Sequence, residues 1–275
     1  MTIASTHRIL FVGDVVGPAA VELLERHLPG LAAAHRADLV VVNGENADVT
    51  GPRPTNGCGL TPASAGRLLA AGADVVTGGN HSWDGPLASE TLGLPRVLRP
   101  DNYGPHAPGT GHAVVAKGGV RFCVVNLASR TALPAADHPY GALEARLEAW
   151  SDDVDVVLVD FHGESVSEKS IFAYAFDGRV AAVLGTHTHV PTADARVLPG
   201  GTAYVTDVGM TGPPSSMQGY EPDVFVAAYR DRLPIAGPAR VAAGPPVLGA
   251  VVVHLHGPTA VAIERLATPT EEAHA

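Results

Sequence analysis

The sequence predicts an α/β protein, because short β-branched runs alternate with helical patterns rich in alanine and leucine. Strands and helices are expected to alternate in the first third of the chain, with strands at 8–14, 38–46 and 73–81 and helices at 21–36 and 63–72. This βαβαβ order is typical of a largely parallel sheet covered on both faces. Six later runs also resemble strands, so we expect two packed sheets flanked by helices: 112–116, 121–128, 155–163, 179–187, 201–209 and 247–256.

The length and composition are those of one domain. A chain of 275 residues with 46% hydrophobic residues can bury one sizeable core, so we expect a single domain over residues 1–275. Proline and glycine concentrate in three segments that we interpret as long surface loops, at 51–62, 99–112 and 209–249, the last with one helical pattern at 222–233. The polar end, about 267–275, is expected to be a disordered tail.

The charge balance disfavours polyanionic partners. The chain carries 28 acidic and 18 basic residues, a net charge of -10, which would repel nucleic acid phosphates and anionic lipid head groups. We therefore expect no stable DNA binding and no membrane association. Any phosphate that the protein handles requires a local positive centre.

Cysteine usage and the N-terminus predict a cytoplasmic protein. Cys58 and Cys123 lie in unrelated contexts without a CxxC motif, so we expect two small buried residues in a reducing compartment, not a disulfide. The N-terminus MTIASTHR has no basic region followed by a long apolar stretch. No apolar run approaches the ~20 residues of a membrane span, so we expect a soluble protein.

Strand after strand is followed by a polar side chain that can bind a metal ion. In an open α/β sheet, ligands bind at the carboxyl ends of the strands, so residues far apart in the sequence can converge on one crevice. The candidates follow five different strands: Asp14, Glu45 with Asn46, Asn80 with His81, His162, and His187 with His189.

Each candidate also has a purely structural interpretation. Asp14 is compatible with a turn or capping residue before a helix, and Glu45 with Asn46 is compatible with a solvated loop pair. Asn80 suits a tight turn that tolerates a left-handed conformation, and His162 suits a buried histidine with satisfied nitrogens. The agreement of five strand ends favours one shared site.

A second His-x-His pair in the same sequence serves as a comparison. His254 and His256 lie within a period-two alternation with valine and leucine, so we expect them on the polar face of a strand, without a metal ion. His187 and His189 differ, because glycine and threonines surround them and proline follows. There the chain is leaving its strand and can direct both rings into a cleft.

The candidate residue types suit a pair of metal ions. Imidazole, carboxylate and amide oxygen are ligands for Mn, Fe or Zn, and no cysteine takes part. Seven candidate ligands are too many for one four-coordinate ion, whereas two ions bridged by one carboxylate would use them all. Only Asp14 and Glu45 are charged, so two divalent cations would keep roughly two positive charges for an anionic phosphate.

Such a pair also suits phosphoester hydrolysis. Two metal ions about 3.5–4 Å apart lower the pKa of a bridging water, and the resulting hydroxide attacks phosphorus in line. The leaving oxygen then requires a proton. His81, next to Asn80 and not required for coordination, is well placed to donate it.

Seven motifs in this order resemble the YmdB-like branch of the calcineurin-like metallophosphoesterases. The likeness extends from about Ile9 to about Leu266 and is carried by ILFVGDVVG, VVNGENA, TGGNHSWD, LRPDNYGPHAPGTG, VDFHGESVSEK, GTHTHVPTAD and GTAYVTDVGMTGP. The resemblance implies a four-layer α/β/β/α sandwich, the metallophosphoesterase fold, with a di-metal site at the strand ends.

The resemblance also implies roles for the individual residues. One metal ion would be held by Asp14, Glu45, Asn46 and His189, and the other by Glu45, Asn80, His162 and His187, with Glu45 as the bridge. His81 would be the catalytic histidine. The implied activity is hydrolysis of 2',3'-cyclic nucleotides to 3'-nucleotides with iron or manganese, zinc and magnesium also being compatible, and family members are often homo-oligomers.

Three departures from the pattern bear mainly on the substrate. The broader superfamily opens with Asp-x-His, whereas two valines follow Asp14, so Asn46 substitutes for the first histidine. The loops 48–62 and 209–223 match loosely, and both are expected to edge the substrate pocket. Two other functions therefore stay open: a nucleotide-binding regulator with little turnover, and a binuclear phosphomonoesterase or 5'-nucleotidase.

Four polar residues near His162 are not assigned to the site. Glu164, Glu168 and Lys169 are compatible with either contacts behind the ligands or a solvated loop. Asp160 would face the same side as His162 if their strand alternates, which makes it the better candidate for a supporting contact.

Overall fold

A computed structural model describes residues 6–48, 58–131, 136–150, 153–236 and 239–269 of the chain. Its core is two packed β-sheets. Sheet 1 has the order β11-β10-β1-β2-β3 and consists of β1 (Thr6–Val12), β2 (Leu39–Asn43), β3 (Val75–Thr77), β10 (Ala250–His256) and β11 (Thr259–Arg265). Sheet 2 has the order β4-β5-β6-β7-β9-β8 and consists of β4 (His112–Lys117), β5 (Val120–Ala128), β6 (Val156–His162), β7 (Ala182–Thr186), β8 (Arg196–Val197) and β9 (Ala203–Val205).

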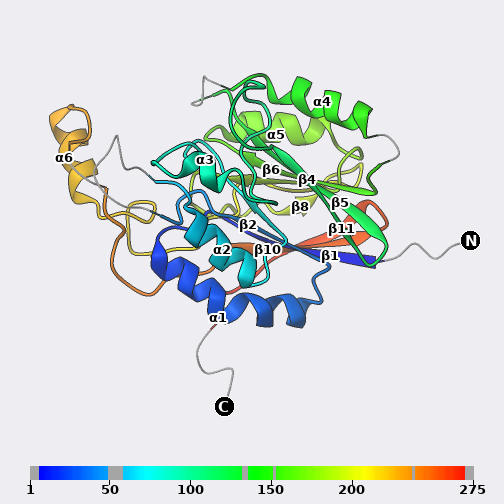
Figure 1. Cartoon of the computed structure of the whole chain (residues 1–275), viewed down its shortest axis with the longest axis horizontal. Helices are drawn as coiled ribbons and strands as arrows, with labels where there is room; N and C mark the ends of the chain where they lie inside the picture. The colour runs from blue at the N-terminus through cyan, green and yellow to red at the C-terminus, as the bar shows by residue number, and fades with distance from the viewer. Residues whose placement is uncertain (1–5, 49–57, 132–135, 151–152, 237–238, 270–275) are drawn as a thin grey trace, which may run out of the picture.

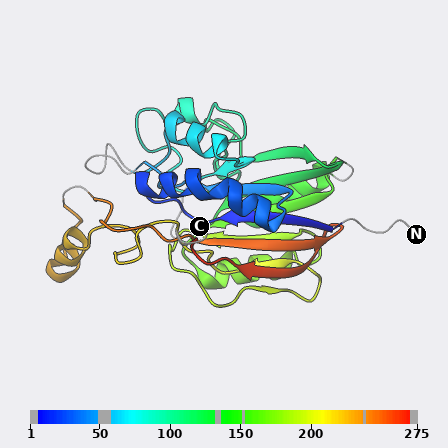
Figure 2. The same cartoon turned by 90° about the horizontal axis from the view of Figure 1, so that it is seen from below.

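Helices cover the outer face of each sheet. They are α1 (Pro18–His35), α2 (Pro62–Ala70), α3 (Ala88–Thr91), α4 (Pro139–Ala149) and α5 (Val166–Ala175), whereas α6 (Asp223–Asp231) buries none of its residues and covers neither sheet. In Figure 1, α4 and α5 lie at the top, α1 and α2 at the bottom, and the two sheets between them; Figure 2 shows the arrangement from below. The layers are therefore α/β/β/α, as the sequence predicts.

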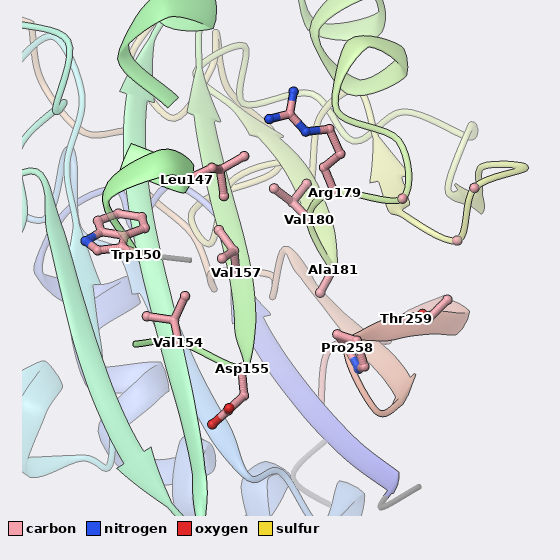
Figure 3. Close-up of a pocket in the computed structure, with 13 residues that line it drawn as sticks. Leu147, Trp150, Val154, Asp155, Val157, Arg179, Val180, Ala181, Pro258 and Thr259 are labelled. Atoms are coloured by element: carbon pink, nitrogen blue, oxygen red, sulfur yellow. The ribbon is translucent and has the colours of Figure 1, made fainter. Parts of the chain in front are cut away.

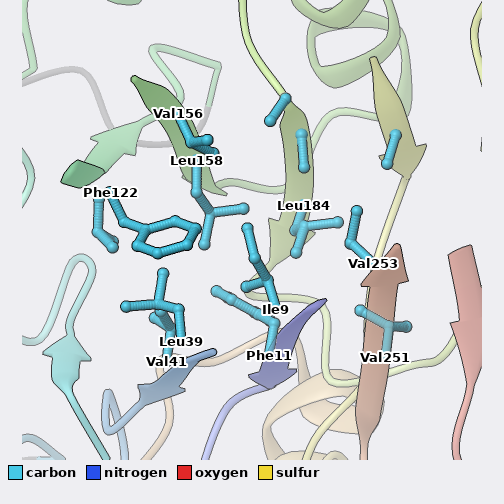
Figure 4. Close-up of a cluster of buried hydrophobic side chains, with 14 of the residues drawn as sticks. Ile9, Phe11, Leu39, Val41, Phe122, Val156, Leu158, Leu184, Val251 and Val253 are labelled. Atoms are coloured by element: carbon cyan, nitrogen blue, oxygen red, sulfur yellow. The ribbon is translucent and has the colours of Figure 1, made fainter. Parts of the chain in front are cut away.

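The period-two alternation of β1 explains the layering. Ile9 and Phe11 point into the core between the sheets, opposite Leu158 and Leu184 of sheet 2 (Figure 4). The side chains of Leu10 and Val12 point the other way, into the hydrophobic cluster that sheet 1 forms with α1 and α2. Because successive strand residues face opposite sides, one strand contributes to two cores.

The sheets are mixed, whereas the sequence predicts a largely parallel arrangement. β1, β2 and β3 are parallel, and so are β5, β6, β7 and β9. The strands β10, β11, β4 and β8 add antiparallel pairs at the edges. Two of these pairs have a local cause, since β4–β5 and β10–β11 are hairpins whose tight turns allow only antiparallel pairing, whereas β1–β10 joins segments far apart in the sequence.

The predicted loops contain buried anchors, so they are not simple surface segments. Arg99 and Asn102 are 6% and 2% exposed in the segment 99–112, and Tyr220 is 5% exposed in 209–249. Residues 49–57 lie outside the described part of the chain. The predicted helix at 222–233 is confirmed as α6, which projects from the body (Figure 1).

The cysteines are buried, as the sequence predicts, whereas the disordered tail stays a prediction. Cys58 and Cys123 are both buried and are not joined by a disulfide. At the start of the predicted tail, Thr268 accepts a hydrogen bond from Leu248 N at 2.9 Å, so this part is attached to the body, while residues 270–275 lie outside the described ranges. Among the helices described, none combines the length and apolarity needed to cross a membrane.

Candidate metal centre

The seven predicted metal ligands and His81 converge at the carboxyl ends of β1, β2, β3, β6 and β7. Five of them are at most 8% exposed: Asp14, Glu45, Asn46, His162 and His189. Asn80, His81 and His187 are partly exposed. The interpretation of Glu45 and Asn46 as a solvated loop pair is therefore wrong, and Asp14 does not cap α1, whose N-cap is Gly17. Asn80 has no positive φ, so the left-handed turn interpretation also fails.

The ring nitrogen Nε2 of His162 lies at the centre of the cluster. It is 3.0 Å from Asn80 Oδ1, 3.1 Å from His187 Nδ1 and 3.4 Å from Glu45 Oε1. Donor atoms that bind one metal ion at about 2.1 Å lie roughly 3.0 to 3.4 Å apart in octahedral or tetrahedral geometry. These separations therefore fit a shared ion, although no three His, Cys, Asp or Glu side chains of the described ranges form a ready metal-binding group.

Each of the three histidines has one ring nitrogen that points away from the cluster, here called the outer nitrogen, and that lies near an oxygen atom of another residue. His162 Nδ1 is 3.0 Å from Thr186 Oγ1, His187 Nε2 is 3.3 Å from Glu164 Oε2, and His189 Nδ1 is 2.8 Å from the Gln218 carbonyl. A neutral imidazole carries only one N–H, so an outer N–H leaves the inner nitrogen with a lone pair. Hydrogen bonds of this kind orient the histidine ligands of metal ions.

Burial in this cluster disfavours the charged form of the histidine rings and of the carboxyl groups. Burial lowers the pKa of both His162 and His187 to about 3. It also raises the pKa of Asp14 and raises that of Glu45 to about 7. Asp14 Oδ1 and Glu45 Oε2 are buried and have no hydrogen-bond partner among the described residues. Asp14 Oδ1 lies 3.8 Å from His189 Nε2, and buried carboxylate oxygens without partners near neutral histidines fit a cation.

Asn46 presents its amide differently from the predicted ligand role. Its Nδ2 lies 3.1 Å from His189 Nε2, while its Oδ1 accepts a hydrogen bond from the Tyr220 hydroxyl at 3.1 Å. Coordination through Oδ1 would require the amide to turn over. Tyr220, which the sequence analysis does not identify, thus contacts a predicted ligand from the loop 209–223.

His81 lies at the edge of the cluster with a carboxylate partner. Its Nδ1 is 2.8 Å from Asp84 Oδ2, and its backbone N–H donates to Glu45 Oε1 at 2.6 Å. The Glu45 contact fixes the main chain of His81 beside the predicted bridging carboxylate. The Asp84 contact orients the ring.

The turn that carries His187 and His189 has an unusual backbone. Both residues have positive φ, 99° and 64°, which costs about 1–3 kcal/mol for each residue that is not glycine. Two buried carboxylates hold this turn: Asp14 Oδ2 accepts from His187 N at 3.1 Å, and Asp207 Oδ2 accepts from Thr188 N at 3.0 Å. Strain maintained in this way is common at functional sites.

The comparison pair lies elsewhere, as the sequence predicts. His254 and His256 are the less buried residues of β10, and Leu255 between them is buried. His254 Nε2 is 3.1 Å from Glu264 Oε1 on β11.

A cavity of about 350 Å³ opens beside the cluster. It is lined by Asn46, Asn80, His81, Glu164, His187, His189, Met217, Gln218, Tyr220 and Phe225. The loop 209–223 therefore edges this pocket, as expected, and Glu164, left out of the predicted site, lines it. Glu168 instead accepts from Ser129 Oγ at 2.5 Å, and Lys169 is fully buried.

Another cavity, of about 190 Å³, lies at the opposite ends of the sheet 2 strands. Figure 3 shows it between the end of α4 and the β10–β11 turn, with Trp150 and Pro258 on its walls. Its charged residues, Asp155 and Arg179, are paired with Arg121 and Glu144. None of the described residues that line it is a histidine, so these residues form nothing comparable to the cluster at the carboxyl ends.

Residues 10–266 match the protein family described as YmdB-like protein. The chain belongs to the YmdB-like family. The YmdB-like chain is 38% identical over 262 residues to the Bacillus subtilis (strain 168) protein named 2',3'-cyclic-nucleotide 2'-phosphodiesterase, and the match covers 94% of this chain and 96% of that protein.

Two crystal structures resemble the YmdB-like chain closely. A hypothetical protein from Thermus thermophilus has a TM-score of 0.86 at 40% identity, covering 95% of this chain and 100% of that one. A Mycoplasma pneumoniae protein described as a novel phosphatase has a TM-score of 0.86 at 31% identity, covering 98% and 96%. The metallophosphoesterase fold and the assignment to phosphodiesterase or phosphatase hydrolases are thereby confirmed. The individual ligand roles stay predictions.

Proposed function

We propose that this YmdB-like chain is a di-metal phosphodiesterase that hydrolyses 2',3'-cyclic nucleotides to 3'-nucleotides. One observation carries the proposal: neutral histidine nitrogens and two buried carboxylate oxygens without partners in the described ranges converge beside a cavity of about 350 Å³. The name of the Bacillus subtilis relative supports the substrate class.

The seven predicted ligands would hold the two ions in the groups stated above, with Glu45 shared between them. Iron or manganese ions bound there would supply positive charge for the phosphate and an acidified water as nucleophile, and the ligand types also allow zinc or magnesium. Phe225 on the cavity wall is partly exposed and offers an aromatic face on which a nucleobase can stack.

His81 would act as the general acid. Attack of water oxygen on phosphorus breaks the bond between phosphorus and the 2' oxygen, and the leaving 2' oxygen takes a proton from the His81 ring. The phosphate then remains on the 3' oxygen. Asp84, which contacts Nδ1 at 2.8 Å, would hold the ring in position for the transfer.

The test is the Mn(II)-dependent rate on 2',3'-cyclic AMP, with the product position identified by chromatography. Chelator-treated and reconstituted protein should release 3'-AMP. His81→Ala should lower kcat by about 10²- to 10⁴-fold while the bound manganese per chain is unchanged. His254→Ala is the matched control, because His254 belongs to a His-x-His pair far from the cluster, and its rate should equal that of the unmodified protein.

Two other functions make different predictions in the same assay. A phosphomonoesterase or 5'-nucleotidase, which the phosphatase description of the Mycoplasma pneumoniae relative keeps open, would hydrolyse a monoester faster than the cyclic diester. A nucleotide-binding regulator would bind the nucleotide tightly and metal-dependently in calorimetry with little turnover. Unchanged kcat in His81→Ala would refute the role of His81. The homo-oligomer implied by the resemblance stays a prediction.

A further inference from the structure

Asp160 connects the two sheets directly beneath the candidate metal centre. The side chain lies on β6 and is fully buried. Its Oδ2 accepts hydrogen bonds from two residues of sheet 1, Asn43 Nδ2 at 2.8 Å and Thr77 Oγ1 at 2.5 Å. Its Oδ1 accepts from Thr186 Oγ1 of sheet 2 at 2.7 Å. Three donors thus converge on one carboxylate. Burial raises the pKa of Asp160 to about 7 despite the hydrogen bonds from Thr77, Thr186 and Asn43, and the ionised group present above that pH can only accept.

The neighbouring groups fix the direction of these bonds. Asn43 Oδ1 accepts from the backbone N–H of Glu45 at 3.0 Å, so the Asn43 amide nitrogen must point toward Asp160. The Thr186 hydroxyl has a single hydrogen, which it donates to Asp160. In its other contact, with His162 Nδ1 at 3.0 Å, Thr186 can therefore only accept.

This direction determines which nitrogen of His162 carries the proton. If Thr186 accepts, His162 Nδ1 is the donor, and a neutral ring then leaves Nε2 with a lone pair. Nε2 is the atom that lies 3.0 to 3.4 Å from Asn80, His187 and Glu45.

Of the three histidines, His162 is the one whose outer nitrogen faces a group that can either donate or accept a hydrogen bond. The outer nitrogens of His189 and His187 face a backbone carbonyl and the carboxylate of Glu164, and both groups accept hydrogen bonds. A threonine hydroxyl can donate or accept, so it does not select a tautomer by itself. The other carboxylate near this nitrogen, Asp14, has its Oδ1 at 3.7 Å, beyond hydrogen-bond distance, so the direction of the hydroxyl is decided by the group behind it.

We propose that Asp160 is a positioning residue that, through Thr186, holds His162 as the Nδ1–H tautomer and so keeps Nε2 available to a metal ion. This role rests on the proposed metal-dependent function. It does not depend on the substrate or on the role of His81.

The Asp160→Asn variant reverses the relay without changing its shape. The new amide keeps its oxygen toward the donors Asn43 and Thr77 and turns its NH₂ group toward Thr186. Thr186 then accepts from that amide and donates to His162 Nδ1, which forces the proton to Nε2. We expect ¹⁵N NMR of the histidine-labelled, chelator-treated protein at about pH 8 to show Nδ1–H in the unmodified chain and Nε2–H in the variant.

Metal binding gives a second readout. In Asp160→Asn, the affinity for one of the two manganese ions should fall by about 10- to 100-fold, the usual effect of losing a residue that orients a ligand. The His162 resonance is assigned by its absence from the His162→Asn protein.

Three further variants separate orientation from simple destabilisation. Thr77→Val removes a donor to Asp160 but leaves the Thr186–His162 contact, so the tautomer and manganese affinity should be unchanged. Thr186→Ser keeps the hydroxyl and should also preserve both. Thr186→Val keeps the other donors of Asp160 but removes the relay, so the Nδ1–H preference and the manganese affinity should both fall, even if Asp160→Asn does not fold.

The outcomes distinguish this role from the proposed activity. His162 remaining Nδ1–H in folded Asp160→Asn or in Thr186→Val would overturn it, and so would an equal loss of manganese in Thr77→Val. Failure to hydrolyse cyclic nucleotides would refute the proposed function but leave the tautomer and manganese results intact.

Discussion

At the scale of one residue, the backbone at Gly79 packs directly against the His162 ring of the candidate metal centre. A Cβ atom added there would overlap both Nε2 and Cδ2 of His162. Real Cβ atoms do not approach other atoms so closely, so the ring or the backbone must move. The His162 ring is fully buried, which leaves it no free direction.

Gly79→Ala should therefore displace His162 and weaken metal binding. We expect the manganese affinity and the rate on 2',3'-cyclic AMP each to fall by at least about 10-fold, because a displaced ring no longer directs Nε2 toward Asn80 and Glu45. Gly66→Ala is the control. Gly66 lies within α2, where an added Cβ meets nothing within 4 Å, so it should keep full activity and gain about 0.5–1 kcal/mol of stability. Full metal binding by Gly79→Ala would contradict the tight packing.

The site residues could be predicted from the sequence only where they directly follow a strand. Residues such as Asp14 and Glu45 end apolar runs, and parallel strands bring such ends to one edge of a sheet. Thr186 lies within β7 and Tyr220 in a loop, so neither carries this signal, whereas Asp207, two residues after β9, does carry it and is not assigned. Thr186 and Tyr220 each act through a contact with a residue far away in the sequence, as when Tyr220 donates to Asn46, and no local pattern encodes such a contact.

At the scale of elements, a buried ion pair joins α5 to two segments of sheet 2. Lys169 on α5 is fully buried; its Nζ donates to Asp207 Oδ2 at 3.0 Å and to the Thr186 carbonyl at 2.7 Å. Asp207 in turn accepts from Thr188 N, within the turn that carries the two histidines. The helix therefore supports the backbone of that turn indirectly.

Lys169→Met should destabilise the protein strongly. Removal of one partner leaves Asp207 as a buried charge without its cation, which typically costs about 3–5 kcal/mol. The measurement is urea unfolding of the metal-free protein. Lys117→Met is the matched control, because Lys117 is 40% exposed and pairs with Asp74 near the surface, so its loss should cost at most about 1 kcal/mol. Similar losses in the two variants would show that burial does not matter here.

The sequence does not predict those helices and strands whose side chains are mostly exposed. β11 is not assigned from the sequence, and most of its residues are exposed, so it shows no alternation of apolar residues. The helix α4 buries only Pro139 and Leu143, which gives it almost no apolar face to detect. Central strands such as β6, buried along its whole length, are those that the apolar runs predicted well.

At the scale of the whole molecule, we propose that residues 1–275 behave as one domain. The core between the sheets takes residues from both, such as Phe11 from sheet 1 and Leu158 from sheet 2 (Figure 4), so neither sheet can unfold without exposing the other. The metal-free protein should therefore unfold in one transition. Far-UV and near-UV circular dichroism should give the same midpoint, and two separate midpoints would indicate two independent units.

A buried cluster around Asp101 makes this global stability depend on pH. The Asp101 side chain is 4% exposed, and it accepts hydrogen bonds from Arg146 on α4 at 2.8 and 3.0 Å. His112 Nδ1 lies 3.5 Å away. Burial acts to raise the pKa of Asp101, but the hydrogen bonds from His112 and Arg146 outweigh it and lower the pKa to about 2.

Because the folded-state pKa lies below the ordinary value of 3.8, ionised Asp101 stabilises the fold above about pH 4, and this contribution is lost as the pH falls toward 2. At about pH 5, the free energy of unfolding of the unmodified chain should exceed that of Asp101→Asn by about 2 kcal/mol. Near pH 2 this difference should disappear. Asp155, whose pKa is also about 2 but whose side chain is 41% exposed beside Arg121, is the control. Salt should abolish the effect of Asp155→Asn and leave that of Asp101→Asn, since solvent and ions screen only the exposed pair. A difference between Asp101→Asn and the unmodified chain that does not change with pH would show that Asp101 acts through packing, not through its charge.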